Sequence, residues 1–293
     1  SNNFNRSSKL SALLRSFNSS LELADNDNTE LILKYIKSCA PGALYRKLNL
    51  IYRIFSGYQD LHNINKFQSK KLVSLIENKK VAVIGPSFIS EKITSKLNDY
   101  DVIVRLNMTQ KIDNEMLEFT GNKVDIIAYG GSRFRWNIER INSLVDENQE
   151  IKFILKKNNN HPIFFEYLKL SSKKIVIKKM FNSSLVFPHG KPFVIPLILM
   201  DLIIHGASEI KVFNVDFYSK KQVYHSGYAT KNHLDDEFTK LNALAMHDTL
   251  SNVNFCRNLA KRGFVTFDSS SLDLLKISNF EYLSMLGEIF LEN

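Results

Sequence analysis

From residue 79 onward, short runs rich in β-branched residues alternate with helical stretches along the sequence. These runs read KVAVIG, YDVIVRLN, KVDIIAYGG, IKFILKK, KKIVIKK, EIKVFNVDF and FVTFDSS. Strands that alternate with helices predict a mostly parallel sheet covered by helices on both faces. The stretch ISEKITSKLND, residues 89–99, is one of the helices that we expect. The fold class predicted for residues 79–293 is therefore α/β, with a Rossmann-like sheet.

Residues 1–78 have a different pattern, which predicts an N-terminal helical section. The stretches SKLSALLRSF, NTELILKYIKSC and ALYRKLNLIYRIFSGY place apolar residues three and four apart, and Pro41-Gly42 interrupts them. The third stretch also carries Arg46, Lys47 and Arg53. These side chains fit contact with an anionic membrane, although the pattern favours packing on the next domain. Because the strands begin only at Lys80, we expect nucleotide binding to survive removal of the helical section.

Charge and cysteine content narrow the class of protein. The chain of 293 residues has 44% hydrophobic residues and a formal net charge of +9, which suits an anionic small substrate or an anionic membrane face. Its lysine clusters lack the interleaved aromatic residues of a nucleic-acid reader, so we expect no nucleic-acid partner. The two cysteines, Cys39 and Cys256, lie far apart in the sequence and indicate a reducing compartment. A cytoplasmic protein is expected.

The carboxyl ends of the predicted strands indicate where a ligand binds, because such ends meet at one edge of a parallel sheet. The segments at these ends are Gly85-Pro86-Ser87, Arg105-Leu106-Asn107, Tyr129-Gly130-Gly131 and Asp216-Phe217. A buried strand that ends in glycine can present backbone N–H groups to a phosphate. The chain has neither a complete Gly-x-Gly-x-x-Gly nor a Gly-Lys-Thr loop after this strand, so the glycine by itself does not identify the ligand.

Six segments follow one another in an order that carries more information than any one of them. They are VIGPS, DYDVIVRLN, GNKVDII, HGASEIKVFNVDFY, VYHSGY and HDTLSNVNFCRNLAKRGFVTF. Over residues 79–270 this order resembles the CMP-sugar-dependent sialyltransferase superfamily, most closely the bacterial enzymes and more distantly the animal ones. The resemblance implies a GT-A-like variant of the Rossmann-like fold in a catalytic domain of residues 79–293.

The resemblance also implies which residues hold the CMP donor. The ribose and phosphate would be held by the glycine loop after the first strand and by an asparagine at the end of the second, which are Gly85, Pro86, Ser87 and Asn107 in this sequence. Loop amides and a hydroxyl group donate to anions, and an asparagine side chain can both donate and accept. Asn107 has an ordinary alternative role as a turn residue that ends a strand.

A second nucleotide segment departs from the pattern of the family. Members carry Ser/Thr-Gly before a long helix, whereas this chain has Pro188 followed by His189, Gly190 and Lys191. These three residues are candidates to replace it, because the N-terminus of a helix and a lysine suit a phosphate. The strand after the helix ends in a segment that matches the family at Asp216 but has Asn214 where glycine is usual.

The resemblance implies that His247, the first residue of the segment HDTLSNVNFCRNLAKRG, is the catalytic base. An imidazole with a pKa near 6.5 suits a general base that takes the proton of the acceptor hydroxyl. His233 is the rival, although it also fits the ordinary start of an acidic helix. Tyr224 and Tyr228 would stabilise the departing phosphate in place of a metal, or would simply be packing residues. No metal site is expected, because the Asp25-Asn26-Asp27 motif lies in the helical section.

The function implied by the resemblance is inverting transfer of a sialic (nonulosonic) acid from a CMP donor to a hydroxyl group of a glycan or glycolipid, with no required cofactor. Transfer of Kdo from CMP-Kdo in capsule or lipopolysaccharide synthesis is the near alternative. A non-catalytic nucleotide-binding module, with His247 as a capping residue, is an alternative of another class. Peripheral contact with the inner face of a bacterial cytoplasmic membrane is a further expectation, motivated by the basic third helix.

Overall fold

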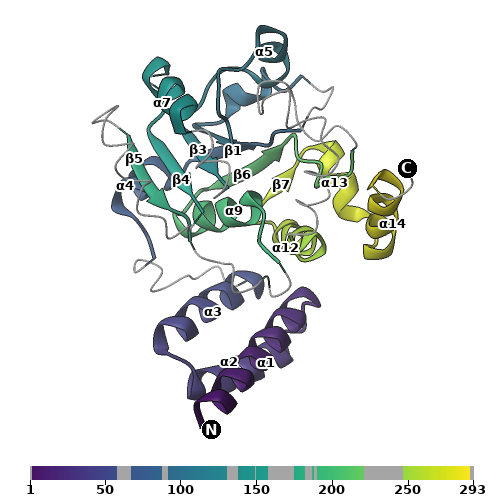
Figure 1. Ribbon diagram of the computed structural model, residues 1–293. Coiled ribbons are helices and arrows are strands. Elements are labelled where there is room, and N and C mark those ends of the chain that lie inside the picture. The colour runs from purple at the N-terminus through teal and green to yellow at the C-terminus, as the bar shows by residue number, and fades with distance from the viewer. Residues whose placement is uncertain are drawn as a thin grey trace.

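The structure is a computed structural model, and it describes residues 2–57, 67–87, 92–130, 138–148, 150–157, 175–181, 187, 190–220 and 247–290. At its centre lies one sheet of seven parallel strands, shown in Figure 1. The strands are β1 (Lys80–Ile84), β2 (Val102–Leu106), β3 (Ile126–Tyr129), β4 (Phe153–Lys156), β5 (Val176–Lys179), β6 (Glu209–Phe213) and β7 (Thr266–Phe267). Each of the runs predicted from the sequence contains one of them, so the predicted fold class is confirmed.

The order of the strands places a change of winding direction at the centre of the sheet. The order is β5-β4-β3-β2-β1-β6-β7, so the chain moves outward from β1 to β5 and then returns to the other side of β1. The carboxyl ends of β1 and β6 therefore flank a topological switch point, where the loops diverge to opposite faces. Ligands of open α/β sheets bind at such points.

Alternate residues of the strands face two cores. Val81 and Val83 of β1 face the larger core, in which α9 (Val194–Ile204) and α12 (Thr249–Lys261) cover the sheet. Ala82 and Ile84 face the other side, together with Leu97 of the 3-10 helix η2 (Lys96–Asp99). Further along that side, α7 (Ile138–Glu147) packs on β3 and β4. Both faces of the central strands are thus buried, which explains why Val81–Ile84 of β1 and all of β3 are apolar, whereas the edge strand β5 is partly exposed and carries two lysines.

The N-terminal section consists of α1 (Asn2–Glu22), α2 (Asn26–Cys39) and α3 (Gly42–Phe55), which gather below the sheet in Figure 1. Their buried side chains belong to the same core as α9 and α12. The ring of Phe55 lies 4.7 Å from that of Phe255 in α12, and the side-chain amide of Asn258 donates to the carbonyl of Leu21 at 3.5 Å. The division of the chain at residue 79 stays a prediction, but this shared core is a reason to expect that residues 79–293 need the helices.

The remaining described helices are α4 (Lys70–Ile76), α5 (Asn114–Thr120), α13 (Ser269–Lys276) and α14 (Asn279–Phe290). The helix predicted at residues 89–99 is wrong in its described part, since residues 92–95 are irregular or turn and only η2 follows. The backbone N–H of Ile93 donates to Phe119 at 2.8 Å, and the hydroxyl of Thr94 donates to Leu117 at 2.9 Å. These tertiary bonds replace helical ones. Of the helices in the described ranges, none has the length and apolar character required to cross a bilayer.

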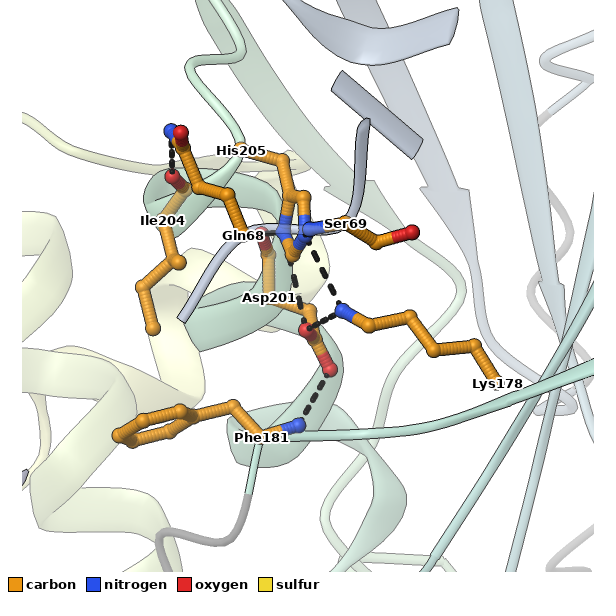
Figure 2. Close-up of polar contacts among 7 residues, drawn as sticks. All are labelled: Gln68, Ser69, Lys178, Phe181, Asp201, Ile204 and His205. Atoms are coloured by element: carbon orange, nitrogen blue, oxygen red, sulfur yellow. Dashed lines mark hydrogen bonds and ion pairs between the residues drawn. The ribbon is translucent and has the colours of Figure 1, made fainter. Parts of the chain in front are cut away.

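A buried polar cluster fixes the C-terminal end of α9, as Figure 2 shows. The carboxylate of Asp201 accepts from the ammonium of Lys178 at 3.1 Å and from the N–H of Phe181 at 2.7 Å. Nε2 of His205 accepts a hydrogen bond from the N–H of Ser69 at 3.0 Å, and Nδ1 of the same ring lies 2.6 Å from the carbonyl oxygen of Asp201. Nδ1 therefore carries the proton and the ring is neutral, in keeping with burial that lowers the pKa of His205 to about 4. The cluster joins α9, β5 and the segment before α4.

Candidate functional site

The candidate site is the carboxyl edge of the sheet, where the strand ends contact one another. Gly85 follows β1, and its N–H donates to the carbonyl of Phe213 in β6 at 2.7 Å. The N–H of Ser87 donates to the carbonyl of Asn214 at 3.2 Å. Since these bonds tie the glycine loop to the end of β6, the loop lies at the topological switch point.

The residue at position 85 must be glycine because β6 approaches it closely. A Cβ atom there would lie 2.2 Å from the carbonyl oxygen of Asn214 and 2.5 Å from Cγ2 of Val215. Pro86 is half-buried and Ser87 is buried. The three loop residues expected to contact the nucleotide therefore lie against the end of β6, and their role as donors to a phosphate stays a prediction.

Asn107 joins the ends of β2 and β3. It adopts a left-handed backbone conformation with φ of 51°, and its side-chain oxygen accepts the N–H of Gly130 at 2.7 Å. Asparagine tolerates this conformation better than most residues. The structure thus gives Asn107 the strand-ending role that the sequence left open, and a contact with ribose or cytosine stays a prediction. Arg105 points to the opposite face, where its guanidinium donates to the carbonyls of Thr120, Gly121 and Lys123.

Asn214, which directly follows β6, is a buried polar residue at this edge of the sheet. Its side chain is 1% exposed, its φ is 57°, and neither its side-chain oxygen nor its nitrogen has a hydrogen-bond partner among the described residues. Leaving a buried amide without partners costs roughly 1–3 kcal/mol for each unmade bond. A bound molecule or water that reached this amide would recover that cost. Sequence reasoning noted only that asparagine replaces a glycine here; the polar residue directly after an apolar strand was the available signal.

Asp216 lies two residues further along and is also buried. Burial raises the pKa of Asp216 to about 6, against the opposing effects of the Ser87 hydroxyl, the Tyr218 N–H and the charge of Lys220. The oxygen Oδ1 accepts the N–H of Tyr218 at 3.2 Å, while Oδ2 has no partner among the described residues. Near neutral pH this group can accept a hydrogen bond from a hydroxyl or amino group of a ligand.

His247 lies at the entrance to α12 and is bound to the segment that enters α9. The backbones of His247 and Lys191 form an isolated parallel β-bridge. Nδ1 of His247 lies 2.7 Å from the carbonyl oxygen of Lys191. Because a carbonyl only accepts, Nδ1 carries the proton and Nε2 keeps its lone pair. Burial and the charges of Lys157 and Lys191 lower the pKa of His247, against the bond to Lys191. The imidazole is therefore neutral near pH 7 and can act as a base.

Gly190 allows the two helix entrances to meet. A Cβ atom at this position would lie 2.4 Å from the backbone nitrogen of Asp248. Asp248 caps α12 by accepting the N–H of Ser251 at 3.1 Å. Asn252 accepts the N–H of Phe193 at 2.7 Å and donates to the carbonyl of Asp248 at 2.5 Å. The entrances of α9 and α12 are thus held as one unit.

Lys157, which follows β4, is a site residue that sequence reasoning missed. Its ammonium donates to the carbonyl of Pro192 at 2.9 Å. Burial and the charge of Lys191 lower the pKa of Lys157 to about 8. The available signal was its position directly after an apolar strand, but the sequence does not distinguish it from its neighbour Lys156.

Several predicted residues lie outside the described parts of the chain. They are His189, Tyr224, Tyr228 and the rival base His233. Their proposed roles stay predictions. Of the residues that are described, no three His, Cys, Asp or Glu side chains come together in a group that could hold a metal ion.

The structure is similar to two crystal structures of mammalian sialyltransferases. The first, in complex with Gal-beta-1-3GalNAc-ortho-nitrophenol, gives a TM-score of 0.44 at 17% identity, and the match covers 83% of this chain and 85% of that chain. The second gives 0.43 at 17% identity, with 78% and 79% covered. No protein-family model matches the sequence, and neither does any curated protein.

Proposed function

We propose that this chain is an inverting, metal-independent glycosyltransferase that transfers a sialic acid from a CMP donor to a glycan hydroxyl group. The observation that carries the proposal is the state of His247. Its Nδ1 is committed to the carbonyl of Lys191, so the lone pair of Nε2 remains for a substrate proton.

The reaction needs one displacement. Nε2 of His247 accepts the proton of the acceptor hydroxyl while the hydroxyl oxygen forms a bond to the anomeric carbon of the donor. The bond from that carbon to the phosphate oxygen breaks, and CMP leaves with the electron pair. Attack from the face opposite the phosphate inverts the configuration. The proton finally passes from His247 to solvent.

The polar groups at the switch point support a nucleotide at this edge. The amide of Asn214 and Oδ2 of Asp216 have no partner among the described residues, and both residues follow β6 next to the glycine loop. Amide and carboxylate groups of this kind suit the amino, carbonyl and hydroxyl groups of a cytidine. The order of motifs along the sequence supports the choice of CMP over other nucleotides.

The decisive experiment measures turnover of CMP-sialic acid with a panel of glycan acceptors. Replacing His247 with alanine or asparagine should lower turnover by about 10²–10⁴-fold, the usual contribution of general base catalysis. CMP affinity should change little, because the base faces the acceptor. Replacing His233 serves as the comparison and should have much less effect. If the His233 variant loses turnover while the His247 variants keep it, the assignment of the base is wrong.

The same assay separates the alternatives. Turnover of CMP-Kdo without turnover of CMP-sialic acid would identify a Kdo transferase. Binding of CMP without hydrolysis or transfer of any CMP-sugar would indicate a nucleotide-binding module. Greater thermal stabilisation by UDP or NAD than by CMP would contradict the proposed donor.

A further inference from the structure

A cluster of basic groups lies around His247. Lys157 reaches from the end of β4 to the carbonyl of Pro192, next to Lys191 in the sequence. The charges of Lys157 and Lys191 both act on His247, and that of Lys191 also acts on Lys157. Three basic side chains from separate segments thus meet at the entrances of α9 and α12.

The charge of Lys157 is not balanced by a carboxylate within the part of the chain that the structure describes. Lys178, which is also largely buried, is paired with Asp201 at 3.1 Å, and Lys152 is paired with Asp125 at 2.7 Å. By contrast, the described contact of the Lys157 ammonium is a carbonyl oxygen, and no acidic group among the described residues acts on its pKa. The carboxylate of Asp248, which follows His247 in the sequence, uses Oδ1 to cap α12. A half-buried ammonium beside another cation is costly unless an anion joins it.

We propose that Lys157 and Lys191 form an oxyanion subsite that binds a negatively charged group of the donor beside Nε2 of His247. This inference rests on the proposed function. In a CMP-activated ulosonic acid, the carboxylate and the phosphate are both attached to the anomeric carbon, which is the atom that the acceptor attacks. Because the acceptor attacks from the face opposite the phosphate, a base that faces the acceptor oxygen lies nearer to the carboxylate than to the phosphate. The carboxylate is therefore the expected ligand, and binding of the phosphate is the alternative outcome of the experiment.

Binding of an anion at this subsite should weaken as the pH rises. The ammonium of Lys157 is charged below its pKa, so an anion is bound at neutral pH and released as the pH rises through about 8. The groups that face Lys157 in the described structure are Lys191 and His247. Because neutral His247 acts as the base, the pH profile of kcat/KM should rise on the acid side and fall above about pH 8.

The test compares Lys157→Met and Lys157→Arg with wild type. Lys80→Met is the control, because it removes the same charge from an exposed site at the start of β1, on the opposite edge of the sheet. We expect Lys157→Met to weaken binding of the anionic group by about 10–100-fold, as for the loss of a hydrogen bond to a charged group. Lys157→Arg should restore binding and move the alkaline fall of kcat/KM to higher pH. Lys80→Met should match wild type.

The source of the oxyanion follows from two measurements. If phosphate is bound, Lys157→Met weakens CMP itself. If carboxylate is bound, CMP affinity is unchanged, KM for CMP-sialic acid rises, and a carboxyl-esterified donor shows no difference between variant and wild type. An unchanged CMP affinity, donor KM and alkaline limb in Lys157→Met would overturn the subsite.

Failure of the proposed function is recognised separately. A wild-type protein that neither binds CMP nor turns over a CMP-sugar contradicts the proposed function. The subsite is then judged by thermal stabilisation with inorganic phosphate and with acetate. Stabilisation of wild type but not of Lys157→Met retains the subsite, and equal responses refute it.

Discussion

Replacing Gly190 with alanine tests whether the base depends on the close approach of two helix entrances. A Cβ atom at residue 190 would lie 2.4 Å from the backbone nitrogen of Asp248 and 2.8 Å from the carbonyl carbon of His247. Ordinary contacts of a Cβ atom begin at 3.4 Å, so the two segments would have to separate by about 1 Å. Both obstructing atoms belong to the backbone, and no side-chain rotation can relieve the contact.

We expect this separation to disturb the hydrogen bond between Nδ1 of His247 and the carbonyl of Lys191. A shift of about 1 Å at a reacting group can lower a rate by roughly 10²-fold. Turnover of the CMP-sugar by Gly190→Ala should therefore fall by about 10²-fold. The contacts of CMP with the loop at Gly85 should be retained, because that loop follows β1 and does not belong to this unit; CMP affinity should fall only if Lys157 and Lys191 bind the phosphate.

Two measurements check this expectation. Steady-state kinetics give turnover, and nitrogen NMR shifts of the His247 ring report whether Nδ1 still carries the proton. Gly287→Ala is the matched control, since a Cβ atom there meets nothing within 4 Å and alanine favours a helix such as α14. Wild-type turnover with an unchanged tautomer in Gly190→Ala would refute the reasoning.

Three further outcomes are expected. Lys178→Met should lower the free energy of unfolding at neutral pH by about 3–5 kcal/mol, because it leaves the buried carboxylate of Asp201 without a cation. Chemical denaturation measures this loss, and a smaller loss at acidic pH, where Asp201 is protonated, would confirm that the unpaired carboxylate is the cause. Asn214→Gly should change the free energy of unfolding by no more than about 1 kcal/mol, since glycine adopts a φ of 57° readily. The same variant should bind CMP more weakly in a binding titration, and an unchanged CMP affinity would contradict a role for the amide. Removing residues 1–57 should prevent cooperative folding, as followed by circular dichroism and thermal melting, because it uncovers Phe255 and its neighbours; a soluble fragment that melts cooperatively would show that the helices are dispensable.

The strands could be predicted from the sequence because both faces of the sheet are buried. The central strands are then short runs of mainly apolar residues, and runs such as KVAVIG and YDVIVRLN stand out without knowledge of the fold. The helix expected at residues 89–99 failed for a physical reason. Its apolar spacing is compatible with a helix, but Ile93 and Thr94 are bound to the segment around Phe119, and such distant bonds leave no mark in local sequence.

The place of the candidate site on the sheet could be predicted from the sequence, but the hydrogen bonds between its distant residues could not. Strand ends placed Gly85 and Asn107 at the carboxyl edge of the sheet, where the structure has them, since that edge follows from parallel topology alone. The bond between His247 and Lys191 joins residues 56 apart, and no spacing rule predicts it. Lys157 was missed because the sequence shows two adjacent lysines after β4. Which of them reaches Pro192 depends on where the strand ends and how its side chains alternate.

The core shared by the N-terminal helices and α12 affects how the chain can fold while it is being synthesised. The amide of Asn258 donates to the carbonyl of Leu21, and the two residues are 237 positions apart. At the usual 5–20 residues per second, the ribosome needs about 10–50 s to make the chain between them. For most of that interval α1–α3 have been synthesised without α12, which shares their core with Phe17 and Ile51. The core that α1–α3 share with α12 can therefore be completed only after α12 has been translated.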